Sequence, residues 1–380
     1  MKVCLSVPGR FHGFDLAREL NKRGVLDCLI TSYPKYKTVA YGIDKSRVKS
    51  IFGKEFIIRG WHFLFGYYPE WFWLNEWYDL EASKVIPNDA DIYILWAGFA
   101  SKTISRIRMI NPEAKIILER GSVHIEEQKR LLNLVQDYQS ISSLIIEKEK
   151  KEYELVDFIS VPGRFSSKSF TDKGVPIDKI FINPYGVNLS LFSEKKIDSK
   201  LFTVGYVGSI SKQKNVSGII SSINILIQKG YKIELLLAGD IDKNSYSQDF
   251  LAKHKFISYM GRLPQEDLPK IYSKMDAFVL NSVQDGFGMV LLQAMSMQVT
   301  PIATYNTGGP DLINDGDNGF LIPILDDNFL AARLELLINN VQLRKVMEVK
   351  ARKTVINGYS WSDYGQRYIL FLNQILRKNY

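Results

Sequence analysis

The sequence predicts an α/β protein made of two doubly wound halves in tandem, with a cleft between them. The chain has 380 residues, enough for two domains that each bury a hydrophobic core. Short apolar runs alternate with helical patterns along most of it, as is typical of parallel sheets covered by helices on both faces. A polar, lysine-bearing stretch around residues 191–200 separates the two series and is the expected linker.

The first half begins with a strand that ends in a glycine turn. Residues 2–7 form an apolar run followed by Pro8-Gly9-Arg10, and a helix with one apolar face is expected directly after this turn. Four further apolar runs predict the other strands of this half. These runs are residues 28–32, 92–96, 116–119 and 158–161.

The second half repeats this alternation after the linker. Its strands are expected at residues 202–207, 233–238, 256–259, 277–281 and 300–303. Helical patterns lie between most of these runs, so a second parallel sheet is expected. No short repeat and no low-complexity segment is found along the chain.

The composition is that of an ordinary soluble globular protein, with 46% hydrophobic and 24% charged residues. Cys4 and Cys28 both lie in apolar, strand-like runs. Buried, reduced thiols in a cytosolic protein are therefore expected, rather than a disulfide or a metal site. We expect no signal peptide, because Met1 and Lys2 lead directly into a strand, and no apolar run is long enough to span a bilayer.

The net charge of +8 is unevenly distributed. Residues 1–60 contain 12 Lys and Arg but only 5 Asp and Glu. Two interpretations remain open: a solvated basic face, or attraction to an anionic membrane surface or glycan. Nucleic acid is not expected as a partner, because no base-reading module is recognisable.

Residues 61–78 are unusually aromatic. Pro69, Glu70 and Glu76 interrupt the segment, which is too short to cross a membrane. One interpretation is packing inside an inserted loop or helix pair; the others are a membrane-surface segment and a groove that stacks acceptor sugars. The aromatic residues are Trp61, Phe63, Phe65, Tyr67, Tyr68, Trp71, Phe72, Trp73, Trp77 and Tyr78.

Two glycine-containing turns that open into helices are candidates for binding an anionic ligand. Residues 207–215 follow the first strand of the second half and carry Lys214, and residues 285–295 begin with Asp-Gly-Phe-Gly. Glycines let the backbone approach a ligand, and a helix start offers unpaired N–H groups. Asp285 and Gln293 are eight positions apart, about two helical turns, so both can face one ligand. Asp285 is equally suited to capping the helix.

Together with other motifs in the same order, these turns resemble the retaining, nucleotide-sugar-dependent glycosyltransferases of family 4. Asp285 and Gln293 stand at the two positions of that family's Glu-x7-Glu signature. Lys214 stands at the lysine of its phosphate site, and Ser209 replaces the usual arginine, whose charge Lys212, Arg262 or Arg10 could supply. The resemblance runs from Gly9 to beyond Trp361. Its other motifs are residues 175–180, 183–188, 259–263, 268–272, 307–313 and 318–321.

The resemblance implies the GT-B fold, in which two facing Rossmann-like, doubly wound domains enclose a deep interdomain cleft. Residues 1–192 are expected to bind the acceptor and residues 193–360 the nucleotide-sugar. Residues 361–380 are expected to form a helix that crosses back to the first domain. The residues implied to contact the donor are Gly9, Ser209, Lys214, Met260, Gly261, Asp285, Gly286, Phe287, Gly288 and Gln293.

The catalytic residues that the resemblance implies are His124, Lys214 and Asp285. His124 ends the loop Glu119-Arg120-Gly121-Ser122-Val123-His124, which looks like the family loop whose histidine faces the donor sugar. His12, between Gly9 and Gly13, is a lesser candidate near donor or acceptor. The four histidines are scattered along the chain, and neither a metal nor another cofactor is expected.

The function that follows from the resemblance is retaining, metal-independent transfer of a sugar from a UDP- or GDP-sugar to a glycan or lipid-linked acceptor. We expect a role in surface polysaccharide biosynthesis, in the cytoplasm, with peripheral contact to an anionic membrane. The alternative is a non-catalytic relative that binds nucleotide-sugars or acts as a scaffold, because Asp285, Gln293 and Ser209 each weaken a family contact with the donor. A dehydrogenase is a poorer alternative, since no G-x-G-x-x-G turn followed by an acidic ribose ligand is found.

Overall fold

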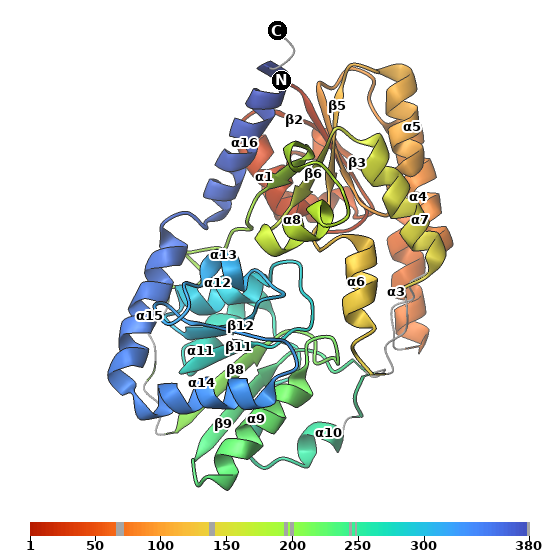
Figure 1. Ribbon diagram of the computed structural model, residues 1–380. Coiled ribbons are helices and arrows are strands. Elements are labelled where there is room, and N and C mark those ends of the chain that lie inside the picture. Colours follow the sequence, from red (N-terminus) through yellow and green to blue (C-terminus); the bar gives the residue numbers. More distant parts are fainter. Residues whose placement is uncertain are drawn as a thin grey trace.

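Two parallel β-sheets, one in each half of the chain, form the framework of the molecule (Figure 1). The structure is a computed structural model that describes residues 1–65, 72–136, 141–193, 197, 201–242, 245–247 and 249–377. Every strand pair in both sheets is parallel, with helices along the chain between the strands. The predicted arrangement of two doubly wound halves is confirmed.

The first sheet has seven strands in the order β3-β2-β1-β4-β5-β6-β7. All five residues of its interior strand β1 are buried, as expected for a parallel strand covered on both faces. The strands are β1 (Val3–Val7), β2 (Leu26–Thr31), β3 (Val48–Ser50), β4 (Ile92–Trp96), β5 (Lys115–Glu119), β6 (Phe158–Val161) and β7 (Ile180–Ile182).

The second sheet has six strands in the order β10-β9-β8-β11-β12-β13. The strand order reverses between the neighbouring strands β8 and β11. Doubly wound sheets bind their ligands at such a switch point, beyond the carboxyl ends of the strands. The strands are β8 (Phe202–Val207), β9 (Ile233–Ala238), β10 (Ile257–Tyr259), β11 (Ala277–Leu280), β12 (Thr300–Thr304) and β13 (Phe320–Ile322).

Helices cover both faces of the first sheet. Side chains of α1 pack with Val3, Leu5 and Val7 in one core, whereas side chains of α4, α5 and α7 pack with Cys4 and Ile30 in another. Both cysteines are free and buried, as the sequence predicts. The helices of this half are α1 (Gly13–Lys22), α2 (Lys35–Val39), α3 (Gly53–Phe65), α4 (Phe72–Val85), α5 (Ser101–Ile110), α6 (Ile125–Leu132), α7 (Ser143–Leu155) and α8 (Arg164–Thr171).

The second sheet is covered in the same way, by α9 and α14 on one face and by α11, α12 and α15 on the other. The core on the α12 face continues through Tyr185 and Val187 into the α1 face of the first domain. The helices of this half are α9 (Val216–Gln228), α10 (Asp249–Ala252), α11 (Leu268–Tyr272), α12 (Met289–Ser296), α13 (Gly309–Leu312), α14 (Asp327–Asn339) and α15 (Val341–Ile356).

The last helix, α16 (Trp361–Arg377), returns to the first domain and lies beside α1 (Figure 1). Its buried side chains recur every three or four positions, which gives it one apolar face. Gly365 permits this close packing, because a Cβ atom there would lie 2.6 Å from the Cβ atom of Glu19. The two domains are therefore joined both by the chain near residue 192 and by this helix.

Three short strands were not expected from the sequence: β3, β7 and β13. Each has three residues and lies at the edge of its sheet, so none has the long apolar run of a central strand. The aromatic segment forms parts of α3 and α4, and its residues 66–71 lie outside the described residues. Much of the expected linker, residues 194–196 and 198–200, lies outside them as well.

Candidate active site

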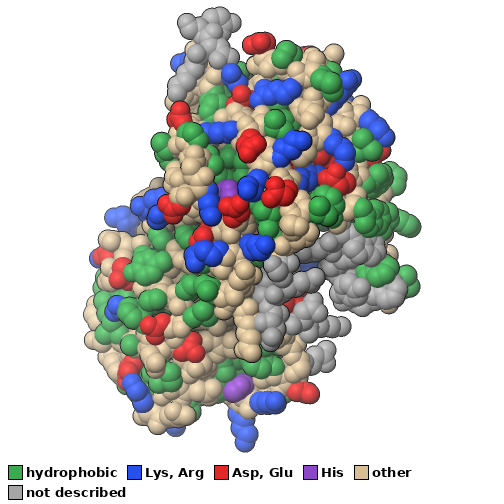
Figure 2. Space-filling view, turned by 45° about the vertical axis from the view of Figure 1, so that its right-hand side comes forward, with side chains coloured by type: hydrophobic (Ala, Val, Ile, Leu, Met, Phe, Trp, Pro, Cys, Tyr) green, Lys and Arg blue, Asp and Glu red, His purple; other side chains and the backbone are tan. Residues whose placement is uncertain are grey.

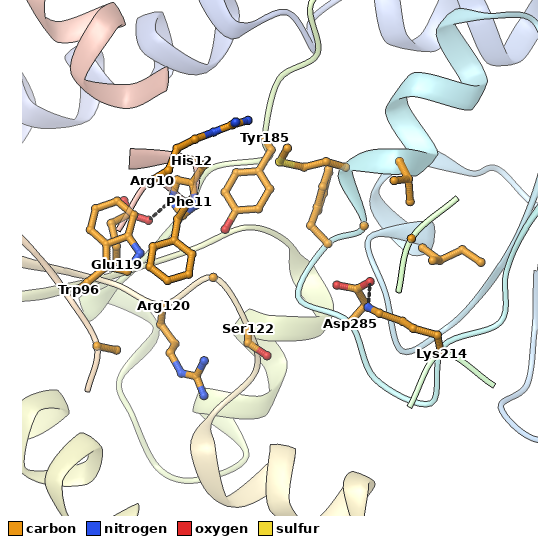
Figure 3. Close-up of a pocket in the computed structure, with 18 of the residues that line it drawn as sticks. Arg10, Phe11, His12, Trp96, Glu119, Arg120, Ser122, Tyr185, Lys214 and Asp285 are labelled. Atoms are coloured by element: carbon orange, nitrogen blue, oxygen red, sulfur yellow. Dashed lines mark hydrogen bonds and ion pairs between the residues drawn. The ribbon is translucent and has the colours of Figure 1, made fainter. Parts of the chain in front are cut away.

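A cleft lies between the two domains, where loops at the carboxyl ends of both sheets meet. Its cavity volume is about 680 Å³, which suits a small organic ligand. Figure 3 shows the first domain on one side of the cavity, with His12 and Tyr185, and the second domain on the other, with Lys214 and Asp285. The sequence prediction of a binding cleft between two lobes thus corresponds to a real cavity.

Lys214 and Asp285 form an ion pair that faces this cavity (Figure 3). Lys214 lies in the loop between β8 and α9, and Asp285 lies in the loop between β11 and α12. The Lys214 ammonium donates to Oδ2 of Asp285 over 2.5 Å. Each side chain is 21% exposed, so a bound molecule can reach both charges. The structure therefore brings together two of the three predicted catalytic residues.

Asp285 does not cap α12, so that interpretation of the sequence is wrong. The helix begins at Met289, and its N-cap is Gly288 in a left-handed conformation with φ of 78°. Asp285 therefore lies before the helix, and it does not share a helix face with Gln293. Gln293 is buried outside the cavity lining, and its Oε1 accepts a hydrogen bond from the Tyr272 hydroxyl at 3.0 Å.

The glycine turn before α12 lies directly against the first domain. A Cβ atom on Gly286 would lie 1.8 Å from the carbonyl oxygen of Gly121, so only glycine fits at this contact. The carbonyl oxygen of Gly286 accepts a hydrogen bond from Ser166 at 3.2 Å. Phe287 and Gly288 line the cavity, whereas Gly286 is used in the contact between the domains.

A second polar contact joins the domains beside the cleft. Asp311 accepts hydrogen bonds from the backbone N–H of Arg164, at 3.1 Å, and from its guanidinium, at 3.2 Å. Burial raises the pKa of Asp311, although Arg164 opposes this shift. A third contact runs from Gln284 Nε2 to Ser122 Oγ over 2.7 Å. Loops and the short helix α13 of the second domain thus contact the first domain at several points around the cavity.

Three glycine turns lie side by side at the carboxyl edge of the second sheet. Gly208 lines the cavity, and a Cβ atom on Gly239 would lie 1.8 Å from the Gly208 carbonyl oxygen. The Gly239 N–H in turn donates a hydrogen bond to the carbonyl oxygen of Gly261. Met260 and Ser209 extend this edge and are exposed, but neither they nor Gly261 lines the cavity. These predicted donor contacts are close to the cavity without forming its wall.

Gly9 lies buried in the turn after β1, next to the cavity wall formed by Arg10, Phe11 and His12. A Cβ atom on Gly9 would lie 3.2 Å from the Phe11 ring. Phe11 has a positive φ of 38°, which is rare for a residue with a side chain, and its ring is 58% exposed. Gly9 therefore lets this turn bring an aromatic ring to the cavity.

The structure does not bring His124, the third predicted catalytic residue, into the cavity. His124 is the N-cap of α6, and its Nδ1 accepts a hydrogen bond from the N–H of Glu126 at 3.2 Å. Its ring packs between Tyr153 and Phe170, with centroids 5.1 and 5.2 Å away. Burial lowers the pKa of His124 to about 4, so the ring is neutral near pH 7. In this conformation the residue holds the start of a helix.

The histidine that lines the cavity is His12, the lesser candidate of the sequence analysis. It is accompanied by side chains that sequence reasoning missed, among them Trp96, Glu119, Arg120 and Tyr185. The first three stand at or directly after the ends of β4 and β5, and this position in a parallel sheet is the signal that could have identified them.

Arg120 is fixed within the wall rather than free to move. Its Nε lies 2.9 Å from Oε2 of Glu149, and its Nη2 donates to Gln128 at 2.6 Å. Burial acts to lower the pKa of Arg120, but Glu149 and Tyr153 outweigh burial and raise it.

Within the described ranges, no group of three or more His, Cys, Asp or Glu side chains is arranged to hold a metal ion. Nor does any helix in those ranges combine the length and the apolar character that crossing a bilayer requires.

Residues 189–354 match the model of the family described as "Glycosyl transferases group 1". The match covers the second sheet and includes both Lys214 and Asp285. Among curated proteins, the capsular polysaccharide biosynthesis glycosyltransferase CapM of Staphylococcus aureus is 28% identical over 239 residues. That alignment covers 57% of this chain and 62% of CapM, so the chain matches less than two thirds of this relative.

Solved structures share the whole fold. A glycosyltransferase from Rickettsia africae has a TM-score of 0.73 at 16% identity, covering 99% of this chain and 98% of that one. Anabaena HepE, crystallised with UDP, has a TM-score of 0.70 at 15% identity, covering 98% of this chain and all of that one. The fold is therefore GT-B, as the sequence predicts.

Proposed function

We propose that the protein is a retaining, metal-independent glycosyltransferase that moves a sugar from a nucleotide-sugar to a glycan or lipid-linked acceptor. The observation that carries this proposal is the Lys214–Asp285 pair, which faces the interdomain cavity from within the segment that matches group 1 glycosyltransferases. A cation beside a carboxylate suits a sugar phosphate, because the cation binds phosphate oxygens and the carboxylate accepts hydrogen bonds from sugar hydroxyls.

Donor binding exchanges the partners of this pair. The Lys214 ammonium turns from Asp285 to the donor phosphate, and the released carboxylate accepts hydrogen bonds from the sugar. When the bond between the sugar and the phosphate breaks, Lys214 stabilises the charge that develops on the leaving oxygen. The positive end of α12, whose first residues Met289 and Val290 line the cavity, adds to this stabilisation. These protein groups supply the role that a metal ion has in other transferases.

The nucleotide is proposed to lie along the three glycine turns of the second sheet, with its base near Met260 and Gly261. Gln293 is proposed to contact the ribose after its side chain leaves Tyr272, because in the free protein it is buried behind the cavity lining. Ser209, Phe287 and Gly288 are proposed to lie against the diphosphate and sugar, with Gly286 allowing the close approach of the two domains beside them. Gly9 provides space on the opposite wall. The UDP bound to the similar HepE supports a UDP-sugar, and GDP-sugars are the second donor class to test.

We propose that the anomeric configuration is retained. In the proposed route, the leaving phosphate takes the proton of the incoming hydroxyl. Carboxylates in the cavity wall support this route, because each already has partners within the described residues. Glu119 bonds His12, and Glu149 bonds Arg120. Asp285 pairs with Lys214 in the free protein, and after its release by the donor it is proposed to be occupied by the sugar hydroxyls. None is thus free in this structure to attack the sugar as a nucleophile.

The acceptor is proposed to belong to surface polysaccharide biosynthesis, as the similarity to CapM suggests, and to bind the first domain. Apolar side chains on α3 and α4 are strongly exposed, for example Phe56 (79%) and Phe63 (88%). Figure 2 shows hydrophobic side chains along the right-hand edge of the upper domain, near Lys and Arg side chains. We propose that this edge contacts an anionic membrane, at the cytoplasmic face, where a lipid-linked acceptor would be anchored.

A thermal-shift panel of UDP- and GDP-sugars tests the proposed donor site. We expect the preferred donor, at about 100 times its Kd, to raise the Tm by roughly 3–5 °C. Lys214→Ala removes most of this rise, whereas Asp285→Ala removes only the part that the sugar contributes. Lys270→Ala is the matched control, because Lys270 forms only an exposed pair with Asp267 within one turn and leaves the donor response unchanged.

Two results would contradict the proposal. If no nucleotide diphosphate or nucleotide-sugar stabilises the wild-type protein, the donor site is wrongly assigned. If a nucleotide-sugar binds but no nucleotide is ever released, with or without added glycan acceptors, the protein is the non-catalytic relative.

A further inference from the structure

A chain of three buried side chains connects the last helix with the cavity. The Tyr368 hydroxyl of α16 donates to Oε1 of Glu119 over 2.5 Å. The other carboxylate oxygen, Oε2, lies 3.1 Å from Nε2 of His12. Tyr368 is fully buried, Glu119 is 2% exposed and His12 is 7% exposed. Figure 3 shows the bond between Glu119 and His12 at the cavity wall.

The His12 ring is held in one orientation. It packs between Trp96 and Tyr185, with ring centroids 4.9 and 4.4 Å away. Because a carboxylate only accepts hydrogen bonds, the Glu119 contact requires a proton on Nε2 of the ring. A neutral His12 therefore presents Nδ1 as an acceptor, since the bond made by one ring nitrogen determines the state of the other.

The acceptor nitrogen is open to the cavity. Nδ1 of His12 has no hydrogen-bond partner in the described part of the chain. It is also absent from the buried polar atoms that lack a partner, so it is accessible to solvent. The residue also lines the cavity. A bound molecule can thus reach Nδ1, and a hydroxyl is the simplest group that donates to it.

We propose that Nδ1 of His12 accepts a hydrogen bond from the hydroxyl of the acceptor that attacks the sugar, with Glu119 and Tyr368 as positioning residues. This inference rests on the proposed function. His12 belongs to the first domain and lies across the cavity from Lys214 and Asp285, on the side assigned to the acceptor (Figure 3). The hydrogen bond holds the hydroxyl oxygen towards the sugar before the reaction. As the bond between the sugar and the phosphate breaks and the oxygen attacks, the single O–H turns from Nδ1 to the leaving phosphate, which takes the proton.

A residue of α16 also positions His12, because the Tyr368 hydroxyl donates a hydrogen bond to one of the two carboxylate oxygens of Glu119. Without the Tyr368 hydroxyl, that carboxylate oxygen loses a buried partner, and the carboxyl group is free to rotate away from His12. A second tyrosine offers a matched comparison. Tyr364, one turn earlier on α16, is also buried, and its hydroxyl has no hydrogen-bond partner in the described structure.

Tyr368→Phe and Tyr364→Phe, compared with the wild type and His12→Gln, test the inference. Each Tyr→Phe change removes one oxygen atom from the same helix. The first measurement is ¹⁵N NMR of the histidine rings in the free protein, with the His12 signals assigned from His12→Gln. We expect a proton on Nε2 and none on Nδ1 of His12 in the wild type, a changed signal in Tyr368→Phe and an unchanged one in Tyr364→Phe.

The second measurement is steady-state transfer. Because His12 orients the attacking hydroxyl, we expect His12→Gln to lower kcat by roughly 10²-fold, and Tyr368→Phe to lower it several-fold. The KM for the nucleotide-sugar stays unchanged in both, because the donor is bound by the other domain. Tyr364→Phe behaves as the wild type in all respects.

The inference is overturned if His12 carries its proton on Nδ1, if the two Tyr→Phe variants cannot be distinguished, or if His12→Gln transfers sugar at the wild-type rate. Failure of the proposed function is recognised separately, because the thermal-shift panel then shows no donor response in the wild type, whatever the NMR spectra show.

Discussion

At the level of single residues, the Lys214–Asp285 ion pair holds two charged side chains at the cavity before a ligand binds. Both side chains are partly exposed, and a pair of this kind typically contributes only about 0–1 kcal/mol to stability. A diphosphate carries more than one negative charge and can bind Lys214 more strongly than Asp285 does. The ion pair therefore keeps both side chains oriented towards the cavity, and it is weak enough for a donor to break.

The first prediction concerns the competition between Asp285 and the phosphate. Asp285→Asn removes the competing charge, so we expect free UDP or GDP to bind about 2–5-fold more tightly, in line with the small free energy of a partly exposed ion pair. Sugar transfer falls in the same variant, because the amide accepts weaker hydrogen bonds from the sugar than a carboxylate does. Isothermal titration calorimetry with the free nucleotide and a nucleotide-release assay measure the two effects.

Asp267→Asn is the control for this experiment, since Asp267 pairs with Lys270 on the surface. The idea is rejected if Asp285→Asn weakens the binding of free nucleotide as much as Lys214→Ala does.

At the level of elements, the loops that follow strands carry most of the site. In the loop after β5, a histidine, His124, caps a helix instead of lining the cavity. His124 accepts a hydrogen bond at the start of α6 with Nδ1, which a protonated ring cannot do. Burial between Tyr153 and Phe170 also disfavours the charged form, and the pKa of His124 is accordingly lowered to about 4. The start of α6 is therefore sensitive to acid.

The second prediction follows from the sign of this shift. The pKa of His124 is lower in the folded chain than the usual value of about 6.5, so its contribution to stability is complete above pH 6.5 and is lost as the pH falls towards 4. Asn caps helices well and does not titrate. Between pH 7 and pH 4.5, we expect the wild type to lose on the order of 1–2 kcal/mol relative to His124→Asn.

Thermal unfolding of both proteins at a series of pH values measures this difference. If the two Tm curves run parallel through that range, the hydrogen bond at the helix start does not control the pH response. Activity measured on the same variant at pH 7.5 tests the predicted catalytic role of His124, since a helix cap that Asn can replace leaves transfer unchanged.

How much could be predicted differs between the fold and the site. All ten strands expected from apolar runs are present, because a strand buried on both faces must be apolar along its length. Lys214 and Asp285 were also identifiable, since both lie in glycine turns after strands. The chain from His12 to Tyr368 was not, because Glu119 and Tyr368 are 249 positions apart and only the return of α16 brings them together.

At the level of the whole molecule, the two domains meet through backbone as well as side chains. Gly286 lies against Gly121 with no space for a side chain, and Arg164 and Asp311 form a polar contact nearby. This closeness places Lys214 and Asp285 opposite His12 across one cavity. Catalysis between domains requires such closure, because it orients the reactants and excludes water from the activated sugar.

The third prediction is that a single methyl group at this contact separates the domains. In Gly286→Ala the new Cβ atom would lie 1.8 Å from the Gly121 carbonyl oxygen, and because both partners are backbone, neither can turn aside as a side chain could. We expect small-angle X-ray scattering to show a larger radius of gyration than in the wild type. Transfer should fall roughly 10²-fold, as a misplacement of about 1 Å between reactants can cause.

Gly60→Ala provides the comparison, because Gly60 lies in α3 and a Cβ atom there meets nothing within 4 Å. Replacing glycine within a helix should leave the shape and activity of the protein unchanged and increase its stability slightly. Nucleotide binding to the second domain alone should survive in Gly286→Ala, since Lys214 and its loop stay in place. An unchanged radius of gyration with full activity would mean that the domains work without this contact, and closure would then have to depend on the Arg164–Asp311 pair and its neighbours.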